Sequence, residues 1–211
     1  MITIKLKGIE KRFHDITILQ NVNVEFKNGK IYGIIGPNGS GKSVLLNIIC
    51  GLMKASEGTV TYNDKIVTKD INVIPDCGII INKPAFFKDV DAFHNLKLLA
   101  DINGKINDAQ IRDTITKVGL IDDKKKVGKY SVGMLQRLGI AQAIMENPNI
   151  LILDEFTNGL DEDGIAMIHS ILKEEREKDK LIIVTSHNKY DIEALCDEVF
   201  KLNGGTLQRE K

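Results

Sequence analysis

Apolar and polar residues alternate in three short stretches of the chain. Residues 2–6, 22–26 and 59–62 each carry an apolar side chain at every second position, the period of a strand with one face in water. An Asn-Gly turn signal follows the second stretch, and an Asn-Asp pair after the third leads into two further apolar residues. The pattern predicts antiparallel strands, the third of them part of a hairpin.

Three other stretches, residues 31–35, 150–153 and 181–184, are apolar almost without interruption. Runs of this length and composition are typical of strands that are buried on both faces of a parallel sheet. Polar residues and then a helical pattern follow each run, as in chains that alternate strands and helices. We therefore predict an α/β fold with a mostly parallel core sheet and an antiparallel β sub-domain at its edge.

The middle of the chain, from about residue 85 to residue 147, has the spacing of helices. Asn107 and Asp108 are suited to begin one helix, because their side chains can cap its first N–H groups. A second apolar helical run begins near Leu135 and ends before Pro148, which disfavours helix at the residue before it. We expect this segment to form a helical sub-domain inserted into the core.

The last third of the chain adds one more long helix and a hairpin. Asp161 precedes a helical run with apolar residues on one face, and the apolar residues 199–202 are followed by an Asn-Gly-Gly turn and residues 206–207. No repeat, low-complexity segment or linker divides the sequence. We therefore expect a single domain over residues 1–211.

Composition and charge exclude several classes of protein. Apolar residues make up 43% and charged residues 27%, and 29 Lys and Arg balance 29 Asp and Glu, so no net charge favours a dedicated nucleic-acid binder. Trp is absent, which argues against base-stacking platforms. The three cysteines are far apart and form no CxxC pair, which indicates reduced thiols in a cytosolic protein.

Hydropathy argues against a membrane-spanning or secreted chain. No stretch approaches the roughly 20 apolar residues that cross a bilayer, and the alternating N-terminal residues lack the apolar region of a signal peptide. We expect a cytoplasmic protein that works at a membrane only through a partner.

The most specific motif follows the apolar run at residues 31–35 and opens a helical run. It reads Gly36, Pro37, Asn38, Gly39, Ser40, Gly41, Lys42, Ser43. This matches G-x-x-x-x-G-K-[ST] in the strand–loop–helix setting that a phosphate loop needs. Its glycines let backbone N–H groups face one anion, and the helix N-terminus adds partial positive charge. We expect Lys42 to bridge the β- and γ-phosphates of ATP and the Ser43 hydroxyl to bind Mg²⁺.

Two acidic residues and a histidine follow the other apolar runs. Asp154 and Glu155 end the run at 150–153, and His187 comes just after the run at 181–184. Because ligands of open α/β sheets bind at the carboxyl ends of the strands, these side chains are expected at one crevice. We expect Asp154 to hold hydrated Mg²⁺ and Glu155 to orient or deprotonate the attacking water. His187 is either a partner of the γ-phosphate or water, or a structural residue.

Ser131 and Gly133 stand before the helical run that begins near Leu135. A helix N-terminus with these residues is suited to a second small anion. The residues alone equally fit an ordinary N-cap serine before an apolar helix.

The order of these motifs resembles that of ATP-binding cassette (ABC) ATPases over essentially the whole chain. The phosphate loop, the Ser-x-Gly element, the Asp-Glu strand, the Asn158–Asp161 segment and the Ser-His pair succeed one another in this order. The resemblance implies a P-loop NTPase core with an inserted helical sub-domain. It also implies that two ATPase chains sandwich two ATP molecules head to tail, with Ser131 and Gly133 of one contacting the γ-phosphate held by the other.

The resemblance gives roles to three more residues. Phe13 matches the aromatic residue that stacks on adenine, although an edge-strand core position is the alternative, and Asp161 matches the residue that couples the two sites. The segment 78–87 looks like the loop that joins the core to the helical sub-domain. Its metal-sensing Gln or Glu is replaced by the shorter Asn82, which leaves either a water bridge to Mg²⁺ or a hinge role.

Several positions depart from the family pattern. Tyr130, Val132 and Met134 stand where Leu, Gly and Gln are usual, and Phe156 stands where Pro usually follows the glutamate. The sequence around these positions is similar to ATPases of bacterial drug and antimicrobial-peptide exporters. The resemblance thus implies an ATP-hydrolysing transporter subunit, held at the inner face of the cell membrane by a permease subunit on a separate chain.

Rival functions differ in their sequence features. A soluble, non-transport ABC ATPase usually has two cassettes or a long coiled-coil insertion, and this sequence has neither. A P-loop kinase would lack the Ser-x-Gly element, and a nucleotide-binding regulator would have lost Glu155 or His187. The substrate, the direction of transport and the choice between homodimer and heterodimer stay open.

Overall fold

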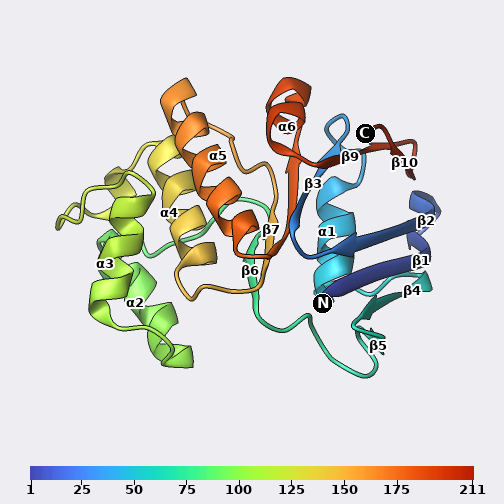
Figure 1. Ribbon diagram of the computed structural model, residues 1–211, viewed down its shortest axis with the longest axis horizontal. Helices are drawn as coiled ribbons and strands as arrows, with labels where there is room; N and C mark the ends of the chain where they lie inside the picture. Colours follow the sequence, from blue (N-terminus) through green and yellow to red (C-terminus); the bar gives the residue numbers. More distant parts are fainter.

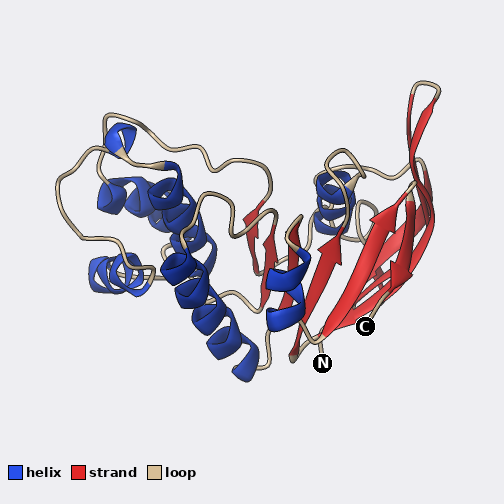
Figure 2. Ribbon diagram, turned by 90° about the horizontal axis from the view of Figure 1, so that it is seen from above, coloured by secondary structure: helices blue, strands red, loops and turns tan.

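The computed structural model describes residues 1–211 apart from the side chains of residues 190 and 191. Its strands are β1 (Thr3–Phe13), β2 (Ile16–Lys27), β3 (Lys30–Ile35), β4 (Glu57–Tyr62), β5 (Lys65–Ile66), β6 (Cys77–Ile80), β7 (Ile150–Leu153), β8 (Leu181–Ser186), β9 (Glu198–Asn203) and β10 (Thr206–Arg209). Its helices are α1 (Lys42–Cys50), α2 (Ala92–Asn103), α3 (Asp108–Lys117), α4 (Val132–Ile144), α5 (Glu162–Glu177) and α6 (Lys189–Leu195), with a short 3₁₀ turn η1 (Val127–Lys129). Helices α2, α3, α4 and α5 gather on one side of the molecule, whereas α1 lies on the other side with the antiparallel strands (Figures 1 and 2).

The core is a six-stranded sheet in the order β10-β9-β3-β8-β7-β6. β9, β3, β8, β7 and β6 run parallel to one another, and β10 is antiparallel to β9. The three continuously apolar runs are β3, β7 and β8, so the prediction of a parallel α/β core is confirmed.

One short element of this core differs from the sequence-based expectation. The segment 78–87 was expected to be a loop, but residues 77–80 form β6, because their backbone pairs with that of β7. The connecting loop therefore begins only after Ile80. The short helix α6 after β8 agrees with the helical pattern expected after this apolar run, although its bounds were not predicted.

The antiparallel strands form a sheet of their own, in the order β2-β1-β4-β5, rather than extending the edge of the core sheet. The predicted hairpin is β4 and β5. The two sheets meet where the Gln20 N–H donates to the Gly205 carbonyl oxygen at 2.8 Å. The β9–β10 hairpin thereby joins the antiparallel sub-domain to the core.

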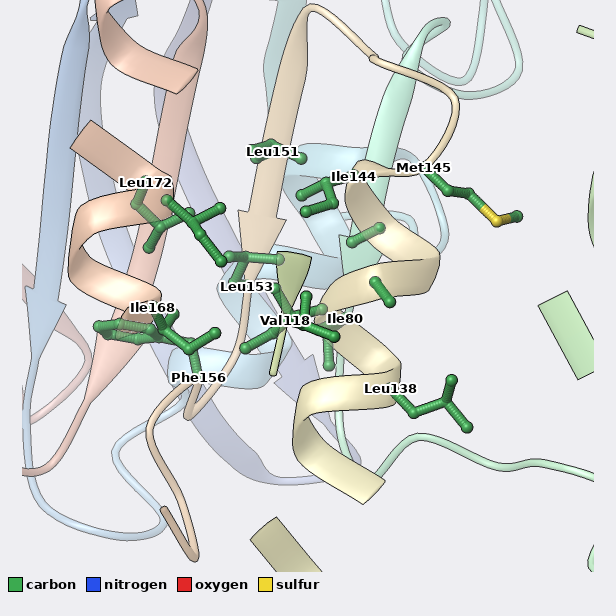
Figure 3. Close-up of a cluster of buried hydrophobic side chains, with 14 of the residues drawn as sticks. Ile80, Val118, Leu138, Ile144, Met145, Leu151, Leu153, Phe156, Ile168 and Leu172 are labelled. Carbon is green, nitrogen blue, oxygen red and sulfur yellow. The ribbon is translucent and has the colours of Figure 1, made fainter. Parts of the chain in front are cut away.

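Alternate residues of β7 enter two different hydrophobic clusters. Ile150 and Ile152 pack with α1 and the antiparallel sheet, whereas Leu151 and Leu153 pack with α4 and α5. Figure 3 shows the second cluster, with Leu151 and Leu153 lying near Ile144 of α4 and Leu172 of α5. Because burying one such side chain is worth about 1.5–3 kcal/mol, packing on both faces fixes the strand firmly.

The helix starts predicted from the sequence are confirmed. Asn107 caps α3 in a reciprocal pair with Gln110, and the Asp161 side chain accepts from the Gly164 N–H at 3.0 Å to cap α5. α4 ends at Ile144, before Pro148. The region between residues 85 and 147 is mainly helical, with α2 and α3 at one side of the molecule in Figure 1.

Candidate active site

The glycine-rich loop between β3 and α1 lines a pocket of about 590 Å³. The other walls come from the antiparallel sheet and from the carboxyl ends of β7 and β8. The lining residues are Phe13, Ile18, Asn38, Gly39, Gly41, Lys42, Ser43, Val44, Glu155, Asn158 and His187. Residues from distant parts of the sequence therefore meet at one crevice, as expected for a sheet of this type.

Two glycines of the loop have conformations or surroundings that exclude a side chain. Gly41, at φ +99°, is the N-cap of α1 and offers no side-chain hydrogen bond to the first turn. A Cβ atom on Gly36 would lie 2.4 Å from the carbonyl oxygen of Leu202. The first N–H groups of α1 consequently stay available to an anion in the pocket.

Lys42 is only 6% exposed although it carries a charge. Its Nζ donates to the carbonyl oxygens of Gly36 at 2.8 Å and Pro37 at 3.3 Å, and it lies 3.3 Å from Oε1 of Glu155. A lysine is rarely so buried unless it is paired. Its ammonium group is thus fixed at the floor of the loop.

Asp154, at the end of β7, is 4% exposed and accepts two short hydrogen bonds. Ser43 Oγ donates to Oδ2 at 2.5 Å, and Thr185 Oγ1 donates to Oδ1 at 2.5 Å. Hydroxyl and carboxylate oxygens side by side suit Mg²⁺, which takes one or two protein oxygens beside phosphate and water. Among the described residues, no group of three or more His, Cys, Asp and Glu side chains is arranged to hold a metal ion.

Glu155 has a left-handed backbone with φ +48°, a conformation uncommon outside glycine. Its Oε2 lies 2.7 Å from Nδ1 of His187, and its N–H donates to Thr185 Oγ1 at 2.9 Å. The side chain of His187 is 59% exposed. A carboxylate with a histidine partner therefore faces the open side of the pocket.

Phe13 lies at the end of β1 and is 41% exposed. The Nζ of Lys11 lies 4.7 Å from the centre of its ring. This exposure excludes the alternative that Phe13 is a core residue of an edge strand.

Ser131, Gly133 and Asp161 do not line the pocket. Ser131 Oγ caps α4 by accepting from the Met134 N–H at 3.2 Å, and Asp161 Oδ1 lies 3.2 Å from the Arg137 guanidinium. Gly133 is so close to the 157–161 loop that a Cβ atom would lie 2.6 Å from the Gly159 carbonyl oxygen. One chain thus brings together only part of the predicted site.

Asn82 follows β6 with φ +65°, a region that Asn tolerates better than most residues. It is exposed, and the carbonyl oxygen of nearby Ile80 accepts from the Asp154 N–H at 2.7 Å. The backbone around Asn82 is therefore linked to that of the carboxylate strand.

Two residues that contact the acidic residues of the site were not predicted from the sequence. Thr185 contacts both acidic residues, and its signal was a hydroxyl at the end of a buried apolar strand. Gln136 is 7% exposed and donates to the carbonyl oxygens of Glu155 and Phe156. In the sequence, Gln136 could have been noticed as a single polar residue within the apolar face of a helix.

Known proteins resemble the chain over nearly its full length. A family model described as ABC transporter matches residues 19–158. The uncharacterised ABC transporter ATP-binding protein YybJ of Bacillus subtilis is 43% identical, over 97% of this chain and 94% of that protein. The lantibiotic transport ATP-binding protein SrtF of Streptococcus pyogenes is 35% identical, over 99% and 90% of the two chains. The bacitracin transport ATP-binding protein BcrA of Enterococcus faecalis is also 35% identical, over 98% and 68%.

A solved structure has the same fold. The dimeric, post-hydrolysis structure of the ATP-binding cassette MJ0796 with ADP and Pi superposes with a TM-score of 0.87 at 26% identity. The match covers 99% of this chain and 98% of that one.

Proposed function

The chain belongs to the ABC transporter family of ATP-binding proteins, and from that premise we propose that it is the ATP-hydrolysing subunit of an exporter of drugs or antimicrobial peptides. The family and the similarity to a cassette with ADP and Pi make it a nucleotide-binding ATPase. The export role is supported by relatives described as lantibiotic and bacitracin transport proteins. The observation that carries the proposal is that Lys42 and Glu155 line the phosphate-loop pocket, with Asp154 directly behind Ser43.

ATP binding follows from the shape and charge of this pocket. The loop and the first turn of α1 supply N–H groups to the phosphates, and Lys42 supplies the cation that bridges them. The partly exposed ring of Phe13 offers a face on which adenine stacks. Asn38, Gly39 and the other loop residues that line the pocket complete the binding site for the phosphates.

The oxygens of Ser43 and Asp154 fit a magnesium ion. When bound, Mg²⁺ would neutralise charge on the phosphate oxygens. Thr185 holds the Asp154 carboxylate in place from the opposite side. We assign Asn82 to this ion through a bridging water, since its side chain is short and Ile80, two residues earlier, is hydrogen-bonded to the Asp154 backbone.

Glu155 is placed to act as general base. It takes a proton from the water that attacks the γ-phosphorus, while the bond to the β–γ bridging oxygen breaks and ADP departs with that electron pair. His187, at 2.7 Å from the same carboxylate, orients it and contacts the γ-phosphate. Lys42 stabilises the charge on the transferred group.

A second ATPase subunit completes the site. Ser131, Gly133 and Asp161 lie outside the pocket of their own chain, at the start of α4 and of α5. In a head-to-tail dimer Ser131 and Gly133 would face the γ-phosphate held by the partner, and Asp161 would couple the two sites. Such an isologous arrangement is self-complementary. The dimeric state of the similar cassette MJ0796 supports this proposal.

A permease on another chain provides the path across the membrane. In the part of the chain that the structure describes, no helix is long and apolar enough to span a bilayer. A groove of about 530 Å³ lies between β6 and the helices α2 and α4. Exposed apolar residues, among them Leu52, Val73 and Ile102, line it, and such a patch marks an interaction site. We assign the permease contact to this groove, which would hold the subunit at the inner face of the membrane.

The test uses Glu155→Gln, which keeps the size of the side chain but removes the carboxylate. ATP should still bind, hydrolysis should fall at least about a hundredfold, and an ATP-dependent dimer should accumulate on gel filtration. Glu25→Gln makes the same chemical change on exposed β2 and should behave as wild type. Normal hydrolysis by Glu155→Gln would remove Glu155 from the mechanism.

Transport is tested separately by fractionation and purification from solubilised membranes. Recovery with a membrane-spanning partner supports the exporter proposal, and a variant such as Ile102→Asp in the groove should release the subunit. A wild-type chain found entirely without membranes would favour a soluble ABC ATPase.

A further inference from the structure

Gln136 is a buried polar residue on α4, a helix whose inner face is otherwise apolar. We propose that Gln136 is a positioning residue that holds the backbone of Glu155 in its left-handed conformation. The proposal rests on the function proposed above, in which Glu155 is the general base. It assigns to the helix that begins at Ser131 a direct effect on hydrolysis in the same chain's pocket.

The side-chain amide of Gln136 reaches from α4 into the turn that follows β7. Its Nε2 donates to the carbonyl oxygens of Glu155 at 3.4 Å and of Phe156 at 3.2 Å. Because a side-chain amide has two N–H groups, it can satisfy both acceptors at once. Gln136 thus binds the two consecutive peptide groups that follow the base.

The peptide group before Glu155 is fixed as well. The Glu155 N–H donates to Thr185 Oγ1 at 2.9 Å, and Thr185 is fully buried. A residue with a side chain at φ +48° persists only where its surroundings impose that conformation. The hydrogen bonds on both sides of Glu155 impose it here.

Phe156 explains why this turn depends on hydrogen bonds. A proline at this position would restrict the backbone of the residue before it, whereas Phe156 leaves the backbone of Glu155 free to rotate. The Phe156 ring is fully buried and stacks on the His169 ring, with centroids 5.9 Å apart. The Phe156 ring fixes the position of the end of this turn, and the hydrogen bonds of Gln136 fix the backbone conformation of the turn.

The expected consequence is a loss of rate without a loss of nucleotide affinity. Gln136 does not line the pocket and does not contact the phosphate loop or Lys42. Without its hydrogen bonds, the turn relaxes and the carboxylate leaves its place beside Lys42 and His187. Ground-state binding by the phosphate loop remains, so kcat falls while KM does not rise.

The experiment compares three substitutions in the purified full-length chain, with ATP hydrolysis and urea unfolding measured for each. Gln136→Met keeps the length of the side chain without a donor, and Gln136→Asn keeps an amide that is too short. Leu138→Met changes a fully buried residue of the same helix and controls for packing. We expect kcat to fall at least about tenfold in Gln136→Met and less in Gln136→Asn, with KM for ATP within about twofold of wild type.

Two further comparisons separate positioning from a structural role. Leu138→Met should keep kcat within about twofold of wild type, and Gln136→Met should add no further loss to Glu155→Gln, because both act through one group. A parallel rise in KM, or an equal fall in kcat in Leu138→Met, would show that Gln136 is merely structural and overturn the proposal. Gln136→Asn supplies the measurement if Gln136→Met does not fold.

Failure of the proposal is distinguishable from failure of the assigned mechanism. If Glu155→Gln is inactive but both Gln136 variants keep the wild-type kcat, only the positioning role is wrong. If Glu155→Gln hydrolyses ATP normally, the assignment of the base is wrong and the positioning role falls with it.

Discussion

Glu175 should make the stability of this protein depend strongly on pH below about 4.5. It lies near the end of α5 and is 3% exposed, within reach of three lysines. Lys178 Nζ donates to Oε1 at 2.8 Å and Lys117 Nζ at 3.2 Å, while Lys180 Nζ pairs with Oε2. Lys180 immediately precedes β8, so this cluster joins α5 to the strand that carries Thr185.

The size of the effect follows from the pKa of that carboxyl. Burial alone raises the pKa of Glu175, but the hydrogen bonds and charges of the lysines outweigh it and lower the pKa from 4.5 to about 2. Well above pH 4.5 the carboxylate is ionised in both states, and the stabilisation is complete. As pH falls from 4.5 towards 2, only the unfolded chain takes up the proton, so stability is lost, by about 3 kcal/mol in total.

The prediction is tested by removing the buried ion pair between Glu175 and Lys180. Glu175→Gln alone keeps an amide oxygen but leaves the ammonium group of Lys180, which is 2% exposed, without its carboxylate partner. Breaking a buried pair in this way costs about 3–5 kcal/mol. Replacing both residues, in Glu175→Met with Lys180→Met, removes both charges and should restore most of the stability.

Urea unfolding followed by far-ultraviolet circular dichroism between pH 6 and pH 3 measures the effect, since the chain has no Trp. The wild type should lose about 2 kcal/mol more over this range than the double variant, because only the wild type carries the shifted carboxyl. Parallel curves for the two proteins would refute the reasoning. So would a Glu175→Gln variant as stable as the wild type at pH 7.

Three further changes test the candidate site. Lys42→Ala removes the cation of the phosphate loop and should weaken ATP binding at least about tenfold in a nucleotide titration, about 1.4 kcal/mol; unchanged affinity would mean that the nucleotide binds elsewhere. Gly133→Ala would place a Cβ atom 2.6 Å from the Gly159 carbonyl oxygen, so the ATP-dependent dimer should weaken on gel filtration while the monomer still binds ATP; an unaffected dimer would exclude this part of α4 from the interface. Asn82→Gly tolerates φ +65° but removes the side chain, so ATPase activity should fall and its dependence on Mg²⁺ should weaken; a curve identical to wild type rules out the water bridge and leaves the hinge role.

Local sequence signals predicted much of the core because they depend on short-range physics. The runs at residues 31–35, 150–153 and 181–184 are apolar on both faces, and only a strand between two packed layers buries both faces. The helix starts at Asn107 and Asp161 are confirmed because a capping side chain satisfies N–H groups only three residues away.

The features of the fold that the sequence did not specify are those that depend on distant partners. β6 is a strand because residues 77–80 pair with β7, more than seventy residues later. The antiparallel strands form a separate sheet because their partners are one another, and the link to the core comes from the β9–β10 turn. The local pattern of apolar residues indicates which face of a strand is buried but not which distant strand it pairs with.

The residues of the candidate site likewise fall into those that the sequence predicts and those that only the structure reveals. The sequence by itself determined the phosphate loop from Gly36 to Ser43 and the positions of Asp154, Glu155 and His187, because a glycine-rich turn and polar residues at strand ends are properties of contiguous residues. Only the tertiary structure decided that Thr185 and Gln136 hold the backbone of Glu155. Their side chains reach it from β8 and α4, and hydrogen bonds between such distant segments form only after the sheet order and the packing of α4 are established.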